Sequence, residues 1–216
     1  MVIDSSCKSF SCLSNERLDL IKEVGNIGAG HAATALSTMF NKRIEMKVPF
    51  VNVLTFQEAL EITGGPENTV VGLYLRVDGE ISGNLFCLLT VEQAEKMASE
   101  MLEKQGADYT SLRDRMSVSV LKEVANIILG AFISAISDLT KLPMYPTVPS
   151  INVDMAGALI SFGLIELSQA SDVVLVINTS LFEAEYNQTV IDCNLLFILD
   201  NPSYEKLFHA IEVSDK

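Results

Sequence analysis

The sequence predicts an α+β fold, a pseudo-two-fold duplicated domain in which two long outer helices cover an antiparallel sheet. The first observation is an internal repeat that relates the two halves of the 216-residue chain at an offset of about 100 residues. The second is a long apolar stripe of helical period at the start of each half, and the third is a pair of strand-like apolar runs later in each half. A chain of this length has room for a well-buried core.

The repeat is clearest where residues 20–37, "LIKEVGNIGAGHAATALS", align with residues 120–137, "VLKEVANIILGAFISAIS". It resumes at "VPFVNV", residues 48–53, and "VPSINV", residues 148–153. Self-similarity at a fixed offset indicates a tandem duplication.

The predicted domain organisation follows from this repeat. Residues 1–14 form a polar, flexible leader, and residues 15–216 form a single domain. This domain consists of two repeats, at about 15–105 and 111–216, which the polar segment "EKQGADYTS" joins.

The first long helix is predicted over a run that contains "EVGNIGAG", residues 23–30. Three glycines in so short a run would also suit a phosphate-binding loop. In the second copy, however, Ala125 and Ile128 replace Gly25 and Gly28, and both are poor residues for positive φ. Neither copy has a dinucleotide or P-loop fingerprint. The segment is therefore predicted to be a helix whose small residues let another helix approach closely.

Residues at helical spacing define an apolar stripe on each long helix. The stripe comprises Leu18, Ile21, Val24, Gly28, Ala32, Ala35 and Met39 in the first half and Leu121, Val124, Ile128, Phe132, Ala135 and Leu139 in the second.

Polar residues predict where the helices begin. Asn15 is expected to cap the first long helix. Ser111, with Asp114 in the first turn, is expected to cap the second. Asn201 before Pro202 predicts the start of the last helix.

A strand near each "VPxxNV" motif is followed by a variable segment and then by two strands. In the first half these two strands form a hairpin over residues 70–90, with Asp78-Gly79 at its turn. Thr90 and Gln93 form a capping-box pattern before the helix that closes this half.

Charge and composition argue against several classes of function. The formal net charge of −13 disfavours nucleic-acid binding, which requires Lys and Arg against the phosphates. The chain lacks a basic start followed by an apolar block, and no apolar run approaches the roughly 18 residues of a membrane span. We therefore expect a cytoplasmic protein without membrane insertion. The four cysteines form no C-x-x-C pair and the two histidines lie far apart, so no metal or other cofactor is predicted.

Opposite the apolar stripe, each long helix carries a polar stripe. Residues at i and i+3 are neighbours with about 5–6 Å between their Cβ atoms, so a carboxylate and a carboxamide lie side by side. The polar stripe comprises Asp19, Glu23, Asn26, Gly30 and Ser37 in the first helix and Ser119, Glu123, Asn126, Gly130 and Ser137 in the second.

A solvated helix face is the ordinary explanation for any single pair of this kind. Asparagine is a mediocre helix former, and Gly30 costs about 1 kcal/mol in a helix interior. The like charges of Asp19 and Glu23 at i and i+4 add a small further cost. An unfavourable stripe that occurs in both copies favours a functional role.

The chemistry of the pair narrows that role. A carboxamide does not titrate near neutral pH, so it is no general base, but it donates and accepts hydrogen bonds and can hold a water molecule. Alignment of this kind is a large part of catalysis in phosphoryl transfer. A neighbouring carboxylate can pair with a lysine of a partner protein. An enzyme built this way would use the metal and the phosphoryl group of its substrate protein, whereas a docking surface without catalysis is the alternative.

The spacing [DS]-x3-E-x2-N-x22-P occurs once in each repeat, and in this respect the sequence resembles the CheC-type phosphatases of bacterial chemotaxis. The resemblance covers nearly the whole chain after the leader. The pattern residues are Asp19, Glu23, Asn26 and Pro49 in the first copy and Ser119, Glu123, Asn126 and Pro149 in the second.

The resemblance implies a phosphatase that removes the aspartyl phosphate of the response regulator CheY. It implies that Asn26 and Asn126 orient the attacking water. It also implies that Glu23 and Glu123 pair with a lysine of the regulator. The Mg²⁺ ion would belong to the regulator, the chain would have no cofactor of its own, and the two prolines would shape the entry into a strand.

The resemblance also implies partners. CheC-type proteins bind the receptor deamidase CheD, which raises their activity. Related CheX-type proteins carry one such helix and dimerise, so a chain with two is expected to act as a monomer. An adaptor that binds CheD or CheY without catalysis is the alternative function.

Overall fold

The computed structural model describes residues 15–104, 106–165, 167, 172–183 and 188–214. The predicted leader at 1–14 lies outside this part of the chain. The strands are β1 Ile44–Lys47, β2 Val51–Thr55, β3 Thr69–Gly79, β4 Gly83–Thr90, β5 Met144–Pro146, β6 Ser150–Met155, β7 Val173–Glu183 and β8 Gln188–Leu199. The helices are α1 Asn15–Phe40, α2 Phe56–Ile62, α3 Val91–Lys104, α4 Arg115–Thr140, α5 Ala156–Ile165 and α6 Asn201–Ser214.

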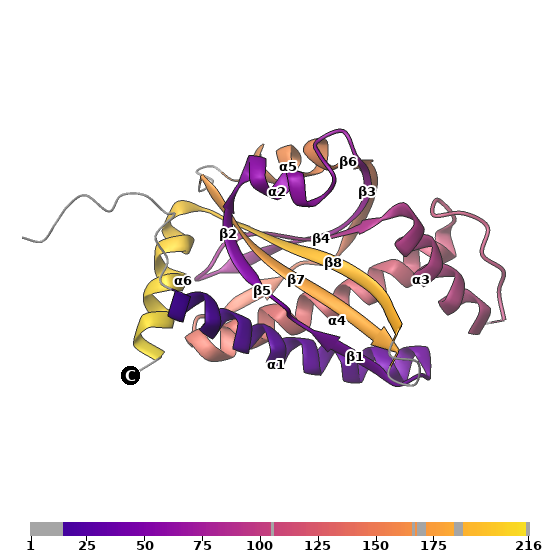
Figure 1. Cartoon of the computed structure of the whole chain (residues 1–216), viewed down its shortest axis with the longest axis horizontal. Helices are drawn as coiled ribbons and strands as arrows, with labels where there is room; N and C mark the ends of the chain where they lie inside the picture. Colours follow the sequence, from indigo (N-terminus) through magenta and orange to yellow (C-terminus); the bar gives the residue numbers. More distant parts are fainter. Residues whose placement is uncertain (1–14, 105, 166, 168–171, 184–187, 215–216) are drawn as a thin grey trace, which may run out of the picture.

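Within the described residues, these strands form an eight-stranded antiparallel sheet (Figure 1). Its order is β1-β7-β8-β4-β3-β5, with β2 also paired to β7 and β6 also paired to β3. The two long strand pairs, β3–β4 and β7–β8, meet at β4 and β8 in the middle of the sheet. The predicted α+β class with an antiparallel sheet is confirmed.

The two repeats exchange their short strands. Strand β2 of the first repeat pairs with β7 of the second, so that Val51 lies opposite Ile177. In the same way β6 of the second repeat pairs with β3 of the first, so that Ile151 lies opposite Leu73. The sheet therefore cannot form from one repeat alone.

Helices cover both faces of the sheet. Figure 1 shows α1 and α4 side by side on one face, with α2 and α5 on the other. Strand residues alternate between the two cores, as the pleat requires. Leu85, Cys87 and Leu89 face the larger core with α1 and α4, whereas Phe86 and Leu88 face the smaller core with α5.

Helix α1 approaches α4 closely at Gly28. A Cβ atom at this position would lie 3.1 Å from the Ala131 carbonyl oxygen and 3.2 Å from the Phe132 Cα atom. The expectation that small residues allow a close helix contact is confirmed here. Ala35, which we expected in the apolar stripe, is exposed, although its counterpart Ala135 is buried.

Helix α4 is apolar because it belongs to the core. By length and composition alone it could cross a membrane, with a mean hydropathy of 1.6 over 18 residues. However, 56% of that window is buried inside the fold, where α4 packs against α1 and the sheet.

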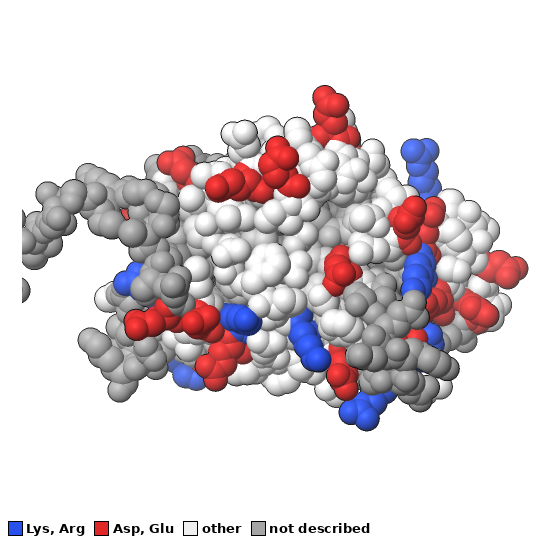
Figure 2. Space-filling view, in the orientation of Figure 1, with Lys and Arg blue, Asp and Glu red and all other residues white. Residues whose placement is uncertain are grey.

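The face shown in Figure 2 carries more acidic than basic side chains, in keeping with the net charge of −13.

The start of α4 differs from the expectation. Its cap is Asp114, whose Oδ2 accepts a hydrogen bond from the Met116 N–H at 3.0 Å. Ser111 lies in the turn before the helix, where its hydroxyl accepts from the Arg113 N–H. Helix α1 begins at Asn15 itself, and the residue before it lies outside the described part.

The first hairpin also turns later than expected. Asp78 and Gly79 remain in β3 because they pair with Tyr145 and Met144 of β5, and the connection runs through residues 80–82. This pairing comes from the other repeat, so the local turn signal could not reveal it.

Two other helix starts agree with the expectation. The capping box at α3 is confirmed, since the Thr90 N–H donates to Gln93 Oε1 and the Gln93 N–H donates to Thr90 Oγ1. Helix α6 begins at Asn201 as expected, with Asp200 accepting from the Ser203 N–H at 2.7 Å.

Candidate functional site

The polar stripes of α1 and α4 lie on the surface. The side chains of Glu23, Asn26, Glu123 and Asn126 are all exposed. A Cβ atom at Gly30 or Gly130 would meet no atom within 4 Å, so the helix surface there is open. Each stripe lies beside the connection between two short strands, residues 48–50 for α1 and 147–149 for α4.

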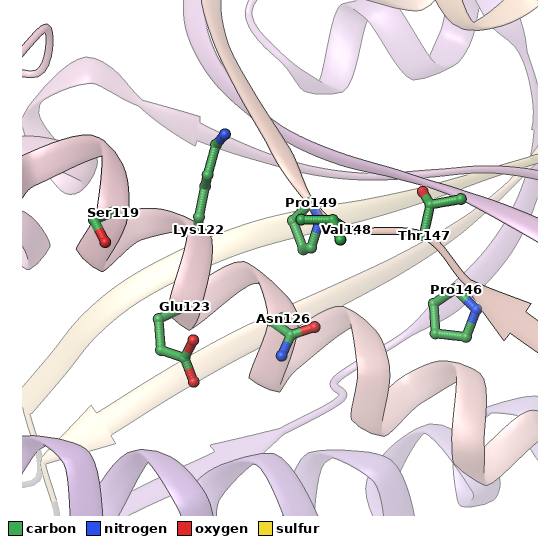
Figure 3. A pocket seen from close by; sticks show the side chains of 8 residues that line it. All are labelled: Ser119, Lys122, Glu123, Asn126, Pro146, Thr147, Val148 and Pro149. Atoms are coloured by element: carbon green, nitrogen blue, oxygen red, sulfur yellow. The ribbon is translucent and has the colours of Figure 1, made fainter. Parts of the chain in front are cut away.

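The second stripe borders a groove of about 360 Å³. Figure 3 shows Glu123 and Asn126 on successive turns of α4, with the segment from Pro146 to Pro149 running past them. The groove is lined by Ser119, Lys122, Glu123, Asn126, Pro146, Thr147, Val148 and Pro149. All four pattern residues of the second repeat thus lie together on one surface.

The functional groups of the second site have no partner within the described chain. Among the residues that the structure describes, no hydrogen bond engages the Asn126 carboxamide, and no ion pair engages the Glu123 carboxylate. The segment beside them is held by Thr147 instead. Its N–H donates to the Arg76 carbonyl oxygen at 2.8 Å, and its Oγ1 accepts from the Arg76 N–H at 3.0 Å.

The first site has a different arrangement. Asn26 Oδ1 accepts a hydrogen bond from the Val48 N–H at 3.0 Å, and its Nδ2 donates to the Lys22 carbonyl oxygen at 2.9 Å. The Val48 side chain is 2% exposed. It packs over Gly25, where a Cβ atom would be 3.4 Å from the nearest valine methyl.

The two strand connections bury opposite residues of their Val-Pro pair. In the first repeat Val48 is buried and Pro49 is exposed. In the second repeat Val148 is 86% exposed and Pro149 is buried. The strand register on either side is the same in both repeats, so the difference is confined to the connection.

The last members of the polar stripes have structural roles. Ser37 Oγ donates to the Ala33 carbonyl oxygen and accepts from the Ile44 N–H at 2.9 Å. Ser137 Oγ donates to the Leu142 carbonyl oxygen at 2.8 Å. These two serines hold the turn that follows each long helix and do not contribute to the site. Asp19 is exposed one turn before Glu23.

Four residues of the groove were not expected from the sequence, namely Lys122, Pro146, Thr147 and Val148. The available signal was a departure from the repeat, because Thr147 stands where the first copy has Lys47. Among the described residues, no group of three or more His, Cys, Asp or Glu side chains could hold a metal ion.

Fold and site together define a class of protein: a duplicated α+β chain that presents a Glu/Asn pair on each of two long helices. Residues 16–53 and 116–153 match the CheC-like family. The chain is 39% identical over 206 residues to the CheY-P phosphatase CheC of Bacillus subtilis, a match that spans 95% of this chain and 98% of that protein. This chain belongs to the CheC-like family.

More distant relatives share the fold. The flagellar motor switch phosphatase FliY of Bacillus subtilis is 28% identical over 127 residues, which span 58% of this chain and 32% of FliY. The crystal structure of Thermotoga maritima FliY superimposes with a TM-score of 0.69 at 18% identity, over 94% of this chain and 98% of that one. The chemotaxis protein CheX of Desulfovibrio desulfuricans gives a TM-score of 0.51 at 16% identity, over 82% and 99%.

Proposed function

We propose that this chain is a phosphatase that hydrolyses the aspartyl phosphate of the response regulator CheY. The observation that carries the proposal is an exposed Glu/Asn pair on each of two long helices, in a chain 39% identical along nearly its whole length to a CheY-P phosphatase. Nothing within the described chain engages the second pair, which leaves it available to a partner protein.

In the proposed reaction, Asn126 holds a water molecule in line with the regulator's phosphoryl group. The amide oxygen accepts one hydrogen bond from this water, while the amide N–H donates a hydrogen bond to a phosphoryl oxygen. The water oxygen forms a bond to phosphorus as the bond from phosphorus to the aspartyl oxygen breaks. Inorganic phosphate leaves with both protons of the water, and the aspartate carboxylate of the regulator is regenerated.

The glutamates fix the position of the regulator. An exposed carboxylate with no ion-pair partner among the described residues, such as Glu123, can form an ion pair with a lysine of the regulator. The open surface at Gly130 leaves space for the regulator to approach, since a Cβ atom there would touch nothing. The Mg²⁺ ion that neutralises the phosphoryl charge is proposed to come with the regulator.

The same proposal covers the wider setting. Because one chain carries two sites, we propose that it acts as a monomer. The cytoplasm as its location and CheD as a further partner are proposed from the resemblance to CheC-type proteins. A docking adaptor without turnover is the second candidate, and the internal hydrogen bond of Asn26 favours it for the first helix.

The test is phosphate release from freshly phosphorylated CheY in the presence of Mg²⁺. We expect the double variant Asn26→Ala/Asn126→Ala to accelerate phosphate release at least about tenfold less than the wild type while still binding the regulator. Orientation of a reacting water contributes a rate factor of at least that size. Asn152→Ala is the matched control, since Asn152 is an exposed asparagine outside the groove. Wild-type protein that binds phosphorylated CheY without speeding its decay would leave the adaptor as the function.

A further inference from the structure

We infer that the two sites are inequivalent in the resting protein: the second site, at Asn126, is open to the regulator, and the first is closed by the hydrogen bond between Asn26 and the Val48 N–H. This inference rests on the proposed function and concerns how that function is divided between the two repeats.

The closure acts on the groups that the reaction needs. A carboxamide offers one oxygen that can accept two hydrogen bonds, and two N–H donors. In the first site the oxygen faces the Val48 N–H at 3.0 Å, and one donor faces the Lys22 carbonyl oxygen at 2.9 Å. A donor on one side and an acceptor on the other fix the orientation of the amide. The second lone pair of the oxygen stays open, but the amide cannot rotate toward the regulator until the bond to Val48 is broken.

Burial reinforces the closure. The Val48 side chain is inserted against α1, over the bare surface that Gly25 leaves, and is 2% exposed. Moving this connection away from the helix would expose the valine to water, which opposes opening. The first site is therefore held closed by a hydrogen bond and by apolar packing together.

The second connection is held in the open arrangement. The hydroxyl of Thr147 accepts the Arg76 N–H, and this bond fastens the connection to β3 of the other repeat. Lys47 stands at the corresponding place in the first repeat, and its side chain cannot accept a hydrogen bond. Its ammonium group lies 5.4 Å from the centre of the Phe182 ring. Val148, the counterpart of Val48, points outward at 86% exposure, and within the described chain its N–H makes no hydrogen bond to Asn126.

The expected consequence is an unequal division of activity. A hydrogen bond of ordinary net strength that must be broken first lowers the activity of the first site by roughly two- to tenfold. Asn126→Ala should therefore remove more of the acceleration than Asn26→Ala. The burial of Val48 increases this difference.

Amide hydrogen exchange of the full-length protein tests the closure without any activity assay. Val48 and Val148 are a matched pair, because only the Val48 N–H has an acceptor within the described chain. We expect the Val48 amide to exchange at least about tenfold more slowly than the Val148 amide. Asn26→Ala should remove that protection at Val48 and leave Val148 unchanged. Equal exchange at the two valines in the wild-type protein would overturn the inference.

Phosphate release with the single variants completes the test. A larger loss in Asn126→Ala than in Asn26→Ala supports the inference, and equal losses overturn it while the proposed function stands. In the Asn126→Ala background, Val48→Pro removes the N–H donor and should raise the activity of the first site; no rise in a folded variant contradicts the closure. If even the double variant retains full activity, the role assigned to the asparagines is wrong and the division between sites falls with it. The proposed function itself fails only if wild-type protein never speeds the decay.

Discussion

The same substitution at two positions of α1 should change stability in opposite directions. Gly28 faces α4, where a Cβ atom would lie 3.1 Å from the Ala131 carbonyl oxygen, 3.2 Å from the Phe132 Cα atom and 3.3 Å from the Ala135 Cβ atom. Gly30, two residues along, would place a Cβ atom in open space. We predict that Gly28→Ala destabilises the fold and that Gly30→Ala stabilises it.

The magnitudes follow from two effects. Replacing glycine by alanine in a helix interior gains about 0.5–1 kcal/mol at either position. At Gly28 this gain is opposed by overpacking, which costs about 1–3 kcal/mol. Two of the three close atoms belong to the α4 backbone, so the helices must move apart rather than one side chain rotating. The net effect should be a loss of about 1 kcal/mol for Gly28→Ala and a gain of about 0.5–1 kcal/mol for Gly30→Ala.

Urea unfolding followed by circular dichroism measures both variants. The expected gap is about 2 kcal/mol in the free energy of unfolding, or roughly 4–8 °C in Tm for a chain of this size. Gly130→Ala on α4 is the control, because a Cβ atom there is equally unobstructed and should stabilise as Gly30→Ala does. If Gly28→Ala stabilises as much as Gly30→Ala, the conclusion that α1 and α4 pack closely at Gly28 is wrong.

Three further predictions concern stability. Asn84 is buried and its Nδ2 donates to the Gly163 carbonyl oxygen at 2.7 Å, so Asn84→Ala should cost about 1–3 kcal/mol of unfolding free energy in urea. A neutral result would mean that this bond contributes nothing. Thr55 and Glu58 form a capping box at the start of α2, so Thr55→Ala should cost about 1 kcal/mol, and no loss in the same assay would contradict the cap. Burial raises the pKa of Tyr204 to about 12, above the usual value of about 10 in the unfolded chain, so stability should fall as the pH rises from about 10 through 12. Tyr204→Phe should remove that part of the fall in thermal unfolding measured across this pH range, and an unchanged alkaline profile would speak against it.

Local and periodic signals predicted most of the elements. The offset of 100 residues and the helical stripes predicted α1 and α4, and the Thr90/Gln93 pattern predicted the start of α3. The exchange of short strands between repeats was not predictable in the same way. A segment such as Val51–Thr55 shows only that it suits a sheet, and the choice of β7 as its neighbour depends on how the two repeats pack. The misplaced hairpin turn has the same cause, since β5 of the other repeat keeps Asp78 and Gly79 in the strand.

The residues of the candidate site were accessible from the sequence, but the difference between its two copies was not. The pattern treats Asn26 and Asn126 alike, and "VPF" and "VPS" look equivalent. Whether a connection turns its valine inward depends on one backbone N–H and on the residues nearby. The exchange of Gly25 for Ala125 and of Lys47 for Thr147 were the visible signals. Neither exchange shows which of the two connections is closed until the neighbours of each residue are known.

Each candidate site depends on both repeats. The helix that carries the Glu/Asn pair belongs to one repeat, but the connection beside it is fastened to a strand of the other. Phe50 accepts a hydrogen bond from the Asn178 N–H of β7 at 3.1 Å, and Thr147 is bonded to Arg76 of β3. Strands β4 and β8 join the two hairpins in one sheet. The two sites are therefore not structurally independent, because the connection beside each Glu/Asn pair is held by the hairpin of the other repeat.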